Sequence, residues 1–313
     1  MGSSDYRLMN MVDEKTRLAG SNRMELLLFS LGGRETFGIN VFKVREVCEV
    51  IPITETPNMP VGVAGIVSLR GAILPVISLS KCLGFHADQP AGKLIVTEFS
   101  GHTQGFLVGD VDRIVRVDWE AVRAPQAMLA AAASQVTALT ELEDGRLVSI
   151  LDVEKIIAEV MGEDPVPTLE PITGQEGRSV FFADDSALAR KKIIQVLDGL
   201  HLPFQQAWNG REALDKLQAL AAQAEASGHK LGETIGLILV DAEMPEMDGY
   251  VLTRSLKADS RFAGIPVVMH SSLSSAANVK LGQQVGVDAY VAKFKPEELG
   301  ATIARMLRGT AHA

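Results

Sequence analysis

The sequence has few aromatic residues and only two cysteines. Aromatic residues make up 5% of the 313 positions and hydrophobic residues 47%, so a folded core must rest on valine, isoleucine, leucine and alanine. Cys48 and Cys82 lie far apart and form no CxxC pair, which argues against a disulfide framework and against a zinc site. We expect two unpaired thiols that pack as small apolar side chains in a reducing compartment.

Positive charge and long apolar runs are also scarce. The chain has 39 acidic and 30 basic residues and a net charge of -9, which argues against nucleic acid as a partner. No apolar run approaches the roughly 18 to 20 residues that cross a bilayer. The first 25 residues contain no signal-peptide core. We therefore expect a cytoplasmic protein that does not insert into the membrane.

The length of the chain and a change in its composition predict two domains. A chain of 313 residues exceeds one comfortable hydrophobic core. Residues 162–177 contain three prolines and three glycines and interrupt every periodic pattern, as a linker does. We predict an N-terminal domain over 22–161, a linker over 162–177 and a C-terminal domain over 178–309.

The N-terminal half is rich in short strands. Gly32 and Gly33 separate two of them and can form a hairpin turn, and residues 153–161 have the apolar spacing of a terminal helix. Closely spaced β-branched segments predict an all-β domain of small barrels. We find no P-loop, no GxSxG and no HExxH motif here. The predicted strands are 24–31, 35–40, 63–71, 72–78, 93–100, 104–111, 112–117 and 146–152.

The C-terminal half alternates strands with helices, which predicts a parallel sheet covered on both faces. Asn209 and Glu212 have the spacing of a helix-capping box before a segment of high helix propensity. Five strands in this alternation fit a flavodoxin-like α/β fold, in which sites form at the carboxyl ends of strands. The predicted strands are 178–183, 203–208, 235–240, 265–270 and 289–293.

Polar residues follow these strands where such a site should form. Asp184 and Asp185 follow the first strand, Asp241 the third, Ser271 the fourth and Lys293 the fifth. Neighbouring carboxylates repel by about 4 kcal/mol per pair at an effective dielectric of 20, so the cluster requires a cation. Mg²⁺ prefers such hard oxygen ligands. The pattern predicts phosphoryl transfer with the third-strand aspartate as nucleophile, while the serine and the lysine stabilise phosphoryl oxygens.

The strings FFADDS, LILVDAEMPEMDGY, IPVVMHSS and DAYVAKFKP resemble response-regulator receiver domains over residues 178–309. The resemblance implies that Asp241 is the phosphoacceptor. It also implies that Asp185 binds the metal directly, that Asp184 binds it through water, and that the backbone carbonyl of Glu243 is the third protein ligand.

The same resemblance makes Tyr290 the switch aromatic, whose ring moves when Ser271 closes on the phosphoryl group. The sequence departs from the family pattern after Lys293, because two residues separate this lysine from the next proline. Lys295 and Ser272 therefore remain alternatives to Lys293 and Ser271, although we favour the first residue of each pair.

One segment has no counterpart in the expected pattern. Residues 224–234, which precede the third strand of the domain, form a longer connection than receivers usually have. We assign this insertion no function. We expect His229 within it to be exposed to solvent.

The strings FGINVFKVREVCEV, GVAGIVSLRGAILPVISL and FLVGDVDRIVRV resemble the CheW coupling domain over residues 22–161. That resemblance implies a pair of five-stranded barrels similar to SH3 domains. It also implies contacts with a chemoreceptor tip and a chemotaxis histidine kinase. Arg70, within VSLRG, is the residue that we assign to the coupling interface.

A coupling domain followed by a receiver resembles the CheV type of chemotaxis coupling protein. This implies a scaffold at cytoplasmic receptor arrays that is modulated by phosphorylation of Asp241. It is not an enzyme with a separate substrate, because the receiver promotes only its own phosphorylation and dephosphorylation. The alternative is a phosphate sink for the kinase, with the coupling domain as a tether. A transcriptional output domain is disfavoured by the acidic charge and the absence of a helix-turn-helix pattern.

Overall fold

The chain forms two compact units in a computed structural model, Arg23–Asp164 and Pro165–Ala313. The division falls inside the predicted linker, parts of which lie outside the described residues, as does residue 22. No helix in the described part of the chain is long and apolar enough to cross a membrane. The structure describes residues 23–85, 92–99, 102–123, 135–162, 168–173, 177–272, 276–293 and 295–310.

The first sheet of the N-terminal unit contains the predicted hairpin. β1 and β2 pair antiparallel, and Gly32 between them has a φ of 97°, which residues with a side chain rarely adopt. The strand order is β8-β1-β2-β10-β9. The elements are β1 (Arg23–Ser30), β2 (Thr36–Asn40), β8 (Asp110–Asp118), the 3₁₀ helix η2 (Trp119–Ala121), β9 (Val136–Glu141) and β10 (Leu147–Leu151).

The second sheet of this unit has the order β3-β6-β7-β5-β4. Its two edge strands approach each other, because Arg70 in the β4–β5 turn forms a 2.8 Å ion pair with Glu46 on β3. The sheet is therefore curled, as a barrel requires. The elements are η1 (Val41–Lys43), β3 (Val44–Glu49), β4 (Val63–Leu69), β5 (Ala72–Ser78), α2 (Leu79–Cys82), β6 (Lys93–Phe99) and β7 (His102–Val108).

One apolar core joins the two sheets and a terminal helix. Helix α4 (Val153–Met161) begins and ends where the sequence predicts, and the Asp152 side chain accepts a hydrogen bond from the Lys155 N–H at its start. Cys48 and Cys82 are free and half-buried, as expected. The core includes Phe29, Phe37, Ile77, Ile95, Phe106 and Ile156. These two five-stranded sheets confirm the predicted all-β class.

Two strands were absent from the sequence prediction, β3 and β9. Each lies at the edge of its sheet, where one side of the strand has no neighbour in the sheet. Edge strands often contain charged residues, and Arg45, Glu46 and Glu49 interrupt the apolar pattern of β3. The edge strands β4 and β8 were predicted, so the interrupted apolar pattern, and not the edge position, concealed β3.

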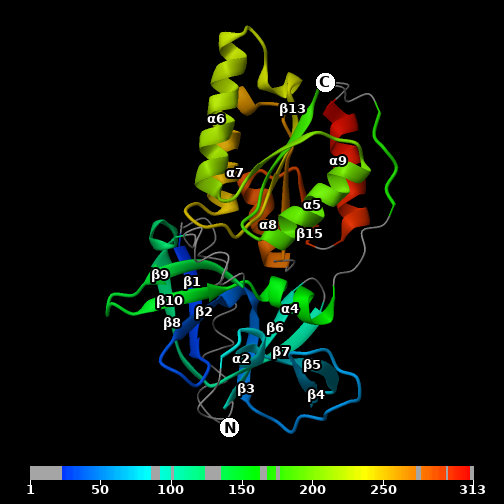
Figure 1. Ribbon diagram of the computed structural model, residues 1–313. Helices are drawn as coiled ribbons and strands as arrows, with labels where there is room; N and C mark the ends of the chain where they lie inside the picture. The colour runs from blue at the N-terminus through cyan, green and yellow to red at the C-terminus, as the bar shows by residue number, and fades with distance from the viewer. Residues whose placement is uncertain are drawn as a thin grey trace. The chain divides into compact units, whose positions relative to one another are not determined.

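The C-terminal unit is a parallel five-stranded sheet between helices. Its order β12-β11-β13-β14-β15 is the predicted flavodoxin-like order. Helices α5 and α9 pack against one face, and α6 and α7 against the other (Figure 1). The strands are β11 (Ser179–Ala183), β12 (Phe204–Ala207), β13 (Ile235–Val240), β14 (Val267–Ser271) and β15 (Ala289–Ala292). The helices are α5 (Ala187–Gly199), α6 (Gly210–Ala226), α7 (Gly249–Ala258), η4 (Ser260–Phe262), α8 (Ala276–Val285) and α9 (Pro296–Thr310).

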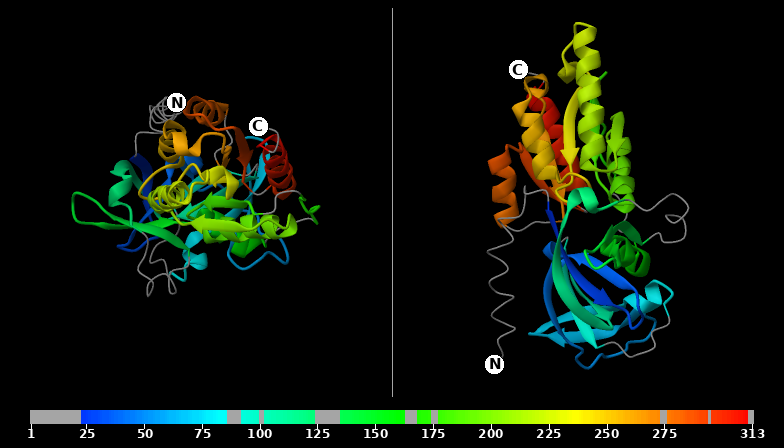
Figure 2. Two further views of the ribbon diagram at one scale, coloured as in Figure 1. Left: turned by 90° about the horizontal axis from the view of Figure 1, so that it is seen from above. Right: turned by 90° about the vertical axis from the view of Figure 1, so that its left-hand side faces the viewer.

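Helix α6 begins at the predicted cap and leads into the insertion. The Asn209 side chain accepts a hydrogen bond from the Glu212 N–H at 2.7 Å. The end of α6 projects beyond the sheet (Figure 2) and continues into the short helix η3 (Leu231–Glu233), whose Leu231 is buried. His229 is exposed, as predicted, and lies 2.9 Å from the Glu233 carboxylate. The insertion therefore lengthens α6 and adds Ala224 and Leu231 to the apolar core of the unit.

Part of the predicted linker packs on the C-terminal unit. Leu169 lies between α5 and α9, where a Cβ on Gly199 would be 3.5 Å from the Leu169 Cβ. A Cβ on Gly300 would be 3.3 Å from the Leu169 Cδ1. The N–H of Ile172 donates to the Leu200 carbonyl at 3.0 Å. Leu169 and Ile172, both half-buried, thus pack against the core of this unit, which the proline-rich composition concealed.

Substitution of Leu169 by alanine should destabilise the C-terminal unit. We expect a loss of about 1 to 2 kcal/mol, below the roughly 2 to 5 kcal/mol of a fully buried leucine, because Leu169 is half-buried. Hydrogen exchange with mass spectrometry should show faster exchange in peptides from α5 and α9. Glu170→Ala, at the exposed neighbouring position, is the control. Equal exchange in the two variants would contradict this packing role.

Candidate functional site

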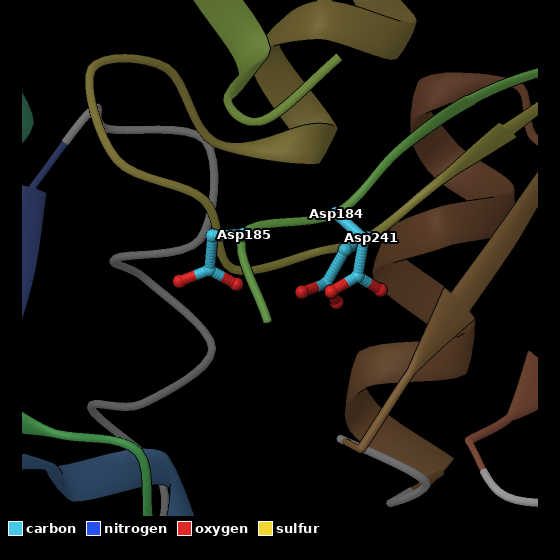
Figure 3. A group of neighbouring side chains, drawn as sticks. All are labelled: Asp184, Asp185 and Asp241. Carbon is cyan, nitrogen blue, oxygen red and sulfur yellow. The ribbon is translucent and has the colours of Figure 1, made fainter. Parts of the chain in front are cut away.

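The carboxyl ends of the sheet strands bring three aspartates together. Asp184 and Asp185 follow β11, and Asp241 follows β13, the adjacent strand. Each offers a carboxylate oxygen, and the three oxygens lie within 4.8 Å of one another. Figure 3 shows the carboxyl groups of Asp184 and Asp241 side by side, with Asp185 beside the pair. The sequence therefore identified residues that the fold does assemble.

Lys293, which follows β15, contacts both buried aspartates. Its Nζ donates to the Asp241 Oδ2 at 2.8 Å. The same Nζ lies 3.0 Å from the Asp184 Oδ2, as an ion pair without good hydrogen-bond geometry. The exposed fractions are 2% for Lys293, 4% for Asp241 and 0% for Asp184. A charged cluster this deeply buried is costly unless its charges are balanced.

The charges of this cluster favour a further cation. Burial raises the pKa of the Asp184 carboxyl well above its usual value. The Lys293 ammonium opposes this shift in pKa, and the negative charges of Asp241 and Asp185 add to it. Asp184 and Asp241 share the Lys293 ammonium, and Asp185 lies beside them. The hard oxygen ligands and their close spacing fit a divalent ion such as Mg²⁺.

Two glycines allow the loops of the site to pack closely. A Cβ on Gly249 would lie 1.9 Å from the Asp241 carbonyl oxygen, and the Gly249 N–H donates to the Ala242 carbonyl at 3.0 Å. A Cβ on Gly210 would lie 2.1 Å from the Met247 carbonyl oxygen. The loop after β13 therefore folds back onto the end of that strand at a distance that only glycine permits.

Ser271 and Tyr290 are linked at the ends of β14 and β15. Tyr290 forms a hydrogen bond with the Ser271 side chain, and its phenol lies close to the Tyr250 hydroxyl. Burial raises the pKa of the Tyr290 phenol to about 12, and its contacts with these two side chains lower it in part. The Tyr250 contact has poor geometry, so its fully buried hydroxyl lacks a well-made partner among the described residues. The position of Tyr250 beside Tyr290 was not anticipated from the sequence, because a tyrosine in a helix is usually a core residue.

The alternative residues occupy different surroundings. Lys295 is exposed and pairs with Glu298 at 3.3 Å, whereas Lys293 contacts the aspartates. Ser272 is buried beside Ser271, so burial does not separate the two serines. Glu243 lies half-buried in the loop after β13, two residues beyond Asp241. Its role as a carbonyl ligand stays a prediction.

Arg70 lies in the N-terminal unit, in a two-residue turn between β4 and β5. Its φ is 52° and that of Gly71 is 84°, which is the pattern of a type I′ hairpin turn. The side chain is 74% exposed and pairs with Glu46. Arg70 is therefore available at the surface, and its role in coupling stays a prediction.

Sequence reasoning missed Arg190, which contacts the backbone of the acidic loop. Its Nη1 donates to the carbonyl oxygens of Asp184 and Asp185, at 2.9 Å each. Its guanidinium carbon lies 5.1 Å from the ring centroid of Trp208. An arginine six residues beyond an aspartate on a helix resembles an ordinary surface residue, so the sequence contains no specific signal for this contact.

Comparisons with known proteins agree with the division of the fold. Residues 25–161 match the CheW-like domain family, and residues 180–304 match the response regulator receiver domain family. The scaffolding protein TtCheW from Thermoanaerobacter tengcongensis is 27% identical, with a TM-score of 0.41, over 45% of this chain and 91% of that one. The fold and the acidic site thus define a receiver domain joined to a CheW-like domain.

Full-length relatives show the same arrangement. Chemotaxis protein CheV3 of Helicobacter pylori is 32% identical over 278 residues, which cover 87% of this chain and 88% of the relative. Chemotaxis protein CheV2 of the same species is 28% identical over 95% of this chain and 98% of the relative. The chain belongs to the CheV family of chemotaxis proteins. It is a signalling scaffold of the chemotaxis two-component system.

Removal of the Lys293 ammonium should destabilise the C-terminal unit. Lys293→Met leaves Asp184 and Asp241 buried without their positive partner, which should lower the free energy of unfolding by about 3 kcal/mol. Mg²⁺ should restore more stability to this variant than to the unmodified protein. Far-UV circular dichroism during urea unfolding, with Mg²⁺ and with chelator, measures both effects. The exposed Lys295→Met is the matched control, and an equal loss in both variants would contradict the prediction.

Proposed function

We propose that this protein couples chemoreceptors to their histidine kinase, and that phosphorylation of Asp241 modulates the coupling. The observation that carries the proposal is the buried contact of Lys293 with Asp241 and Asp184, within an acidic cluster at the strand ends. Membership of the CheV family of chemotaxis proteins supports the proposal that chemoreceptors and their histidine kinase are the partners. We expect the protein at the cytoplasmic receptor arrays, where both partners meet.

The reaction at the site transfers one phosphoryl group. A carboxylate oxygen of Asp241 attacks the phosphorus of a phosphohistidine, the P–N bond breaks, and an aspartyl phosphate forms. The leaving imidazole takes up a proton. Lys293 donates to the phosphoryl oxygens, and Ser271 offers a hydroxyl to another oxygen as the group arrives. The protein is modified once in each cycle and turns over no separate substrate.

The acidic cluster is where a Mg²⁺ ion would be held. Asp185 and Asp241 would bind it directly, Asp184 through water, and Glu243 through its backbone carbonyl. The bound ion would neutralise the carboxylates and the phosphoryl oxygens. The close spacing of the three carboxylates supports this assignment.

Phosphorylation of Asp241 would change the surface of the domain through Ser271 and Tyr290. Movement of the Ser271 hydroxyl to the phosphoryl group would break its hydrogen bond with the Tyr290 phenol. The ring would then be free to turn, and the surface formed by β14, α8 and β15 would change. A coupling free energy of about 1 to 3 kcal/mol would alter the affinity for partners 5- to 150-fold.

Replacement of the phosphoacceptor should abolish transfer. Asp241→Asn should receive no label from the phosphorylated kinase in Mg²⁺, and chelation should stop labelling of the unmodified protein. Asp198→Asn, an exposed position on α5, should be labelled normally. Electrophoresis of radiolabelled mixtures measures transfer. Labelling of Asp241→Asn equal to that of the unmodified protein would rule out the assigned acceptor.

The lifetime of the label separates regulation from a phosphate sink. A regulatory state should persist for minutes and should change receptor–kinase assembly. Loss of the label within seconds, with assembly unchanged, would instead favour the sink.

Removal of Arg70 should weaken assembly without altering phosphorylation. One arginine in an interface commonly contributes 1 to 2 kcal/mol, so Arg70→Ala should reduce affinity for the receptor–kinase complex about 5- to 30-fold. Co-sedimentation with receptor-containing membranes and kinase measures the affinity. Arg113→Ala, at an arginine 55% exposed in its side chain, is the control. Unchanged co-sedimentation of Arg70→Ala would exclude Arg70 from the interface.

A further inference from the structure

Arg190 binds the backbone of the two-aspartate loop from the first turns of α5. One nitrogen, Nη1, donates to the carbonyl oxygens of Asp184 and Asp185, at 2.9 Å each. This nitrogen has two hydrogens, so each carbonyl can receive its own hydrogen bond. The backbone carbonyls of both aspartates therefore accept hydrogen bonds from the same rigid guanidinium.

Trp208 provides the second support of this guanidinium. The Arg190 guanidinium carbon lies 5.1 Å from the indole centroid, which is within the range of a cation–π contact. Trp208 follows β12, the strand beside β11, and its backbone N–H donates to the Glu212 carboxylate at 2.7 Å. The indole is 60% exposed, an unusual position for the largest apolar side chain. In this exposed position the indole contacts the Arg190 guanidinium.

The Glu212 carboxylate attracts Arg190, but two other charges act against an arginine at this position. Arg190 lies near the N-terminus of α5, where the helix dipole favours anions over cations. A divalent ion at the acidic cluster would repel it further. A guanidinium suits this position because it is planar. It can donate two hydrogen bonds to the loop and stack on the indole at the same time, which a lysine ammonium cannot do.

We propose that Arg190, stacked on Trp208, is a positioning residue that fixes the backbone of Asp184 and Asp185 so that their carboxylates meet a divalent ion. The inference rests on the proposed function, since it concerns the metal site of that reaction. Asp184 is also fixed through its Oδ1, which accepts from the Ser186 N–H at 3.0 Å. The half-buried Asp185 lies at the side of the cluster in Figure 3, and its backbone carbonyl is one of the two that Arg190 binds.

The sign of the effect distinguishes positioning from simple charge. If Arg190 were only a nearby cation, its removal would relieve repulsion and tighten the binding of a divalent ion. If it positions the loop, its removal should weaken binding, although one repelling charge is lost. Loss of a group that orients metal ligands commonly reduces affinity 10- to 100-fold, so we expect Arg190→Ala to weaken binding about tenfold.

The experiment titrates the full-length, unphosphorylated protein with Mn²⁺, and electron paramagnetic resonance measures the free ion. Arg190→Ala should raise the dissociation constant about tenfold. Trp208→Ala, which keeps the arginine, should raise it about threefold. Arg190→Lys should remain impaired despite its charge. Lys191→Ala, the loss of one positive charge at the next position of α5, should leave binding unchanged or slightly tighter.

A second measurement separates a positioning role from a general loss of structure. Phosphorylation of each variant by a small-molecule phosphodonor should require a higher Mg²⁺ concentration for the half-maximal rate, while the rate at saturating Mg²⁺ stays close to that of the unmodified protein. A lower saturating rate with unchanged Mg²⁺ dependence would overturn the inference.

The outcomes also separate this inference from the proposed function. If the unmodified protein binds no Mn²⁺, the metal site itself is refuted. If the unmodified protein and Arg190→Ala bind Mn²⁺ equally, or if Arg190→Ala binds it more tightly, the positioning role is refuted and the metal site stands.

Discussion

The structure of the C-terminal unit depends on one buried interaction, the contact of the Lys293 ammonium with the carboxylates of Asp184 and Asp241. These side chains come from the ends of three strands, so the parallel order of the sheet is the condition for their meeting. Burial strengthens the attraction and raises the cost of any unbalanced charge. Any change in the charge of one of these three groups therefore alters the stability of the cluster.

The same cluster is connected to a surface through short-range contacts. Ser271 and Tyr290 share a hydrogen bond, and a Cβ on Gly282 of α8 would lie 3.1 Å from the Tyr290 ring. Tyr250, fully buried and poorly partnered, lies next in this series. The Tyr290 phenol therefore lies between the Ser271 hydroxyl and a buried hydroxyl that has no well-made partner among the described residues.

Much of this architecture was predictable from the sequence, for identifiable physical reasons. Buried parallel strands such as Ile235–Val240 form continuous apolar runs, and the chemistry of a parallel sheet follows its strand ends, which identified Asp184, Asp241 and Lys293. The strand β3 was missed because charged residues interrupt its apolar pattern. The fit of Leu169 and the bonds of Arg190 depend on three-dimensional contacts with groups that no local pattern encodes.

These missed contacts share a consequence for how the unit is organised. Leu169 packs against α5 and α9, so the chain that enters the unit is anchored on the face made by these helices. Arg190 extends from the same helix α5 to the aspartate loop and to Trp208. Helix α5 therefore contacts both the entering segment and the acidic loop. The packing of this one helix on the sheet is therefore a shared condition of both contacts.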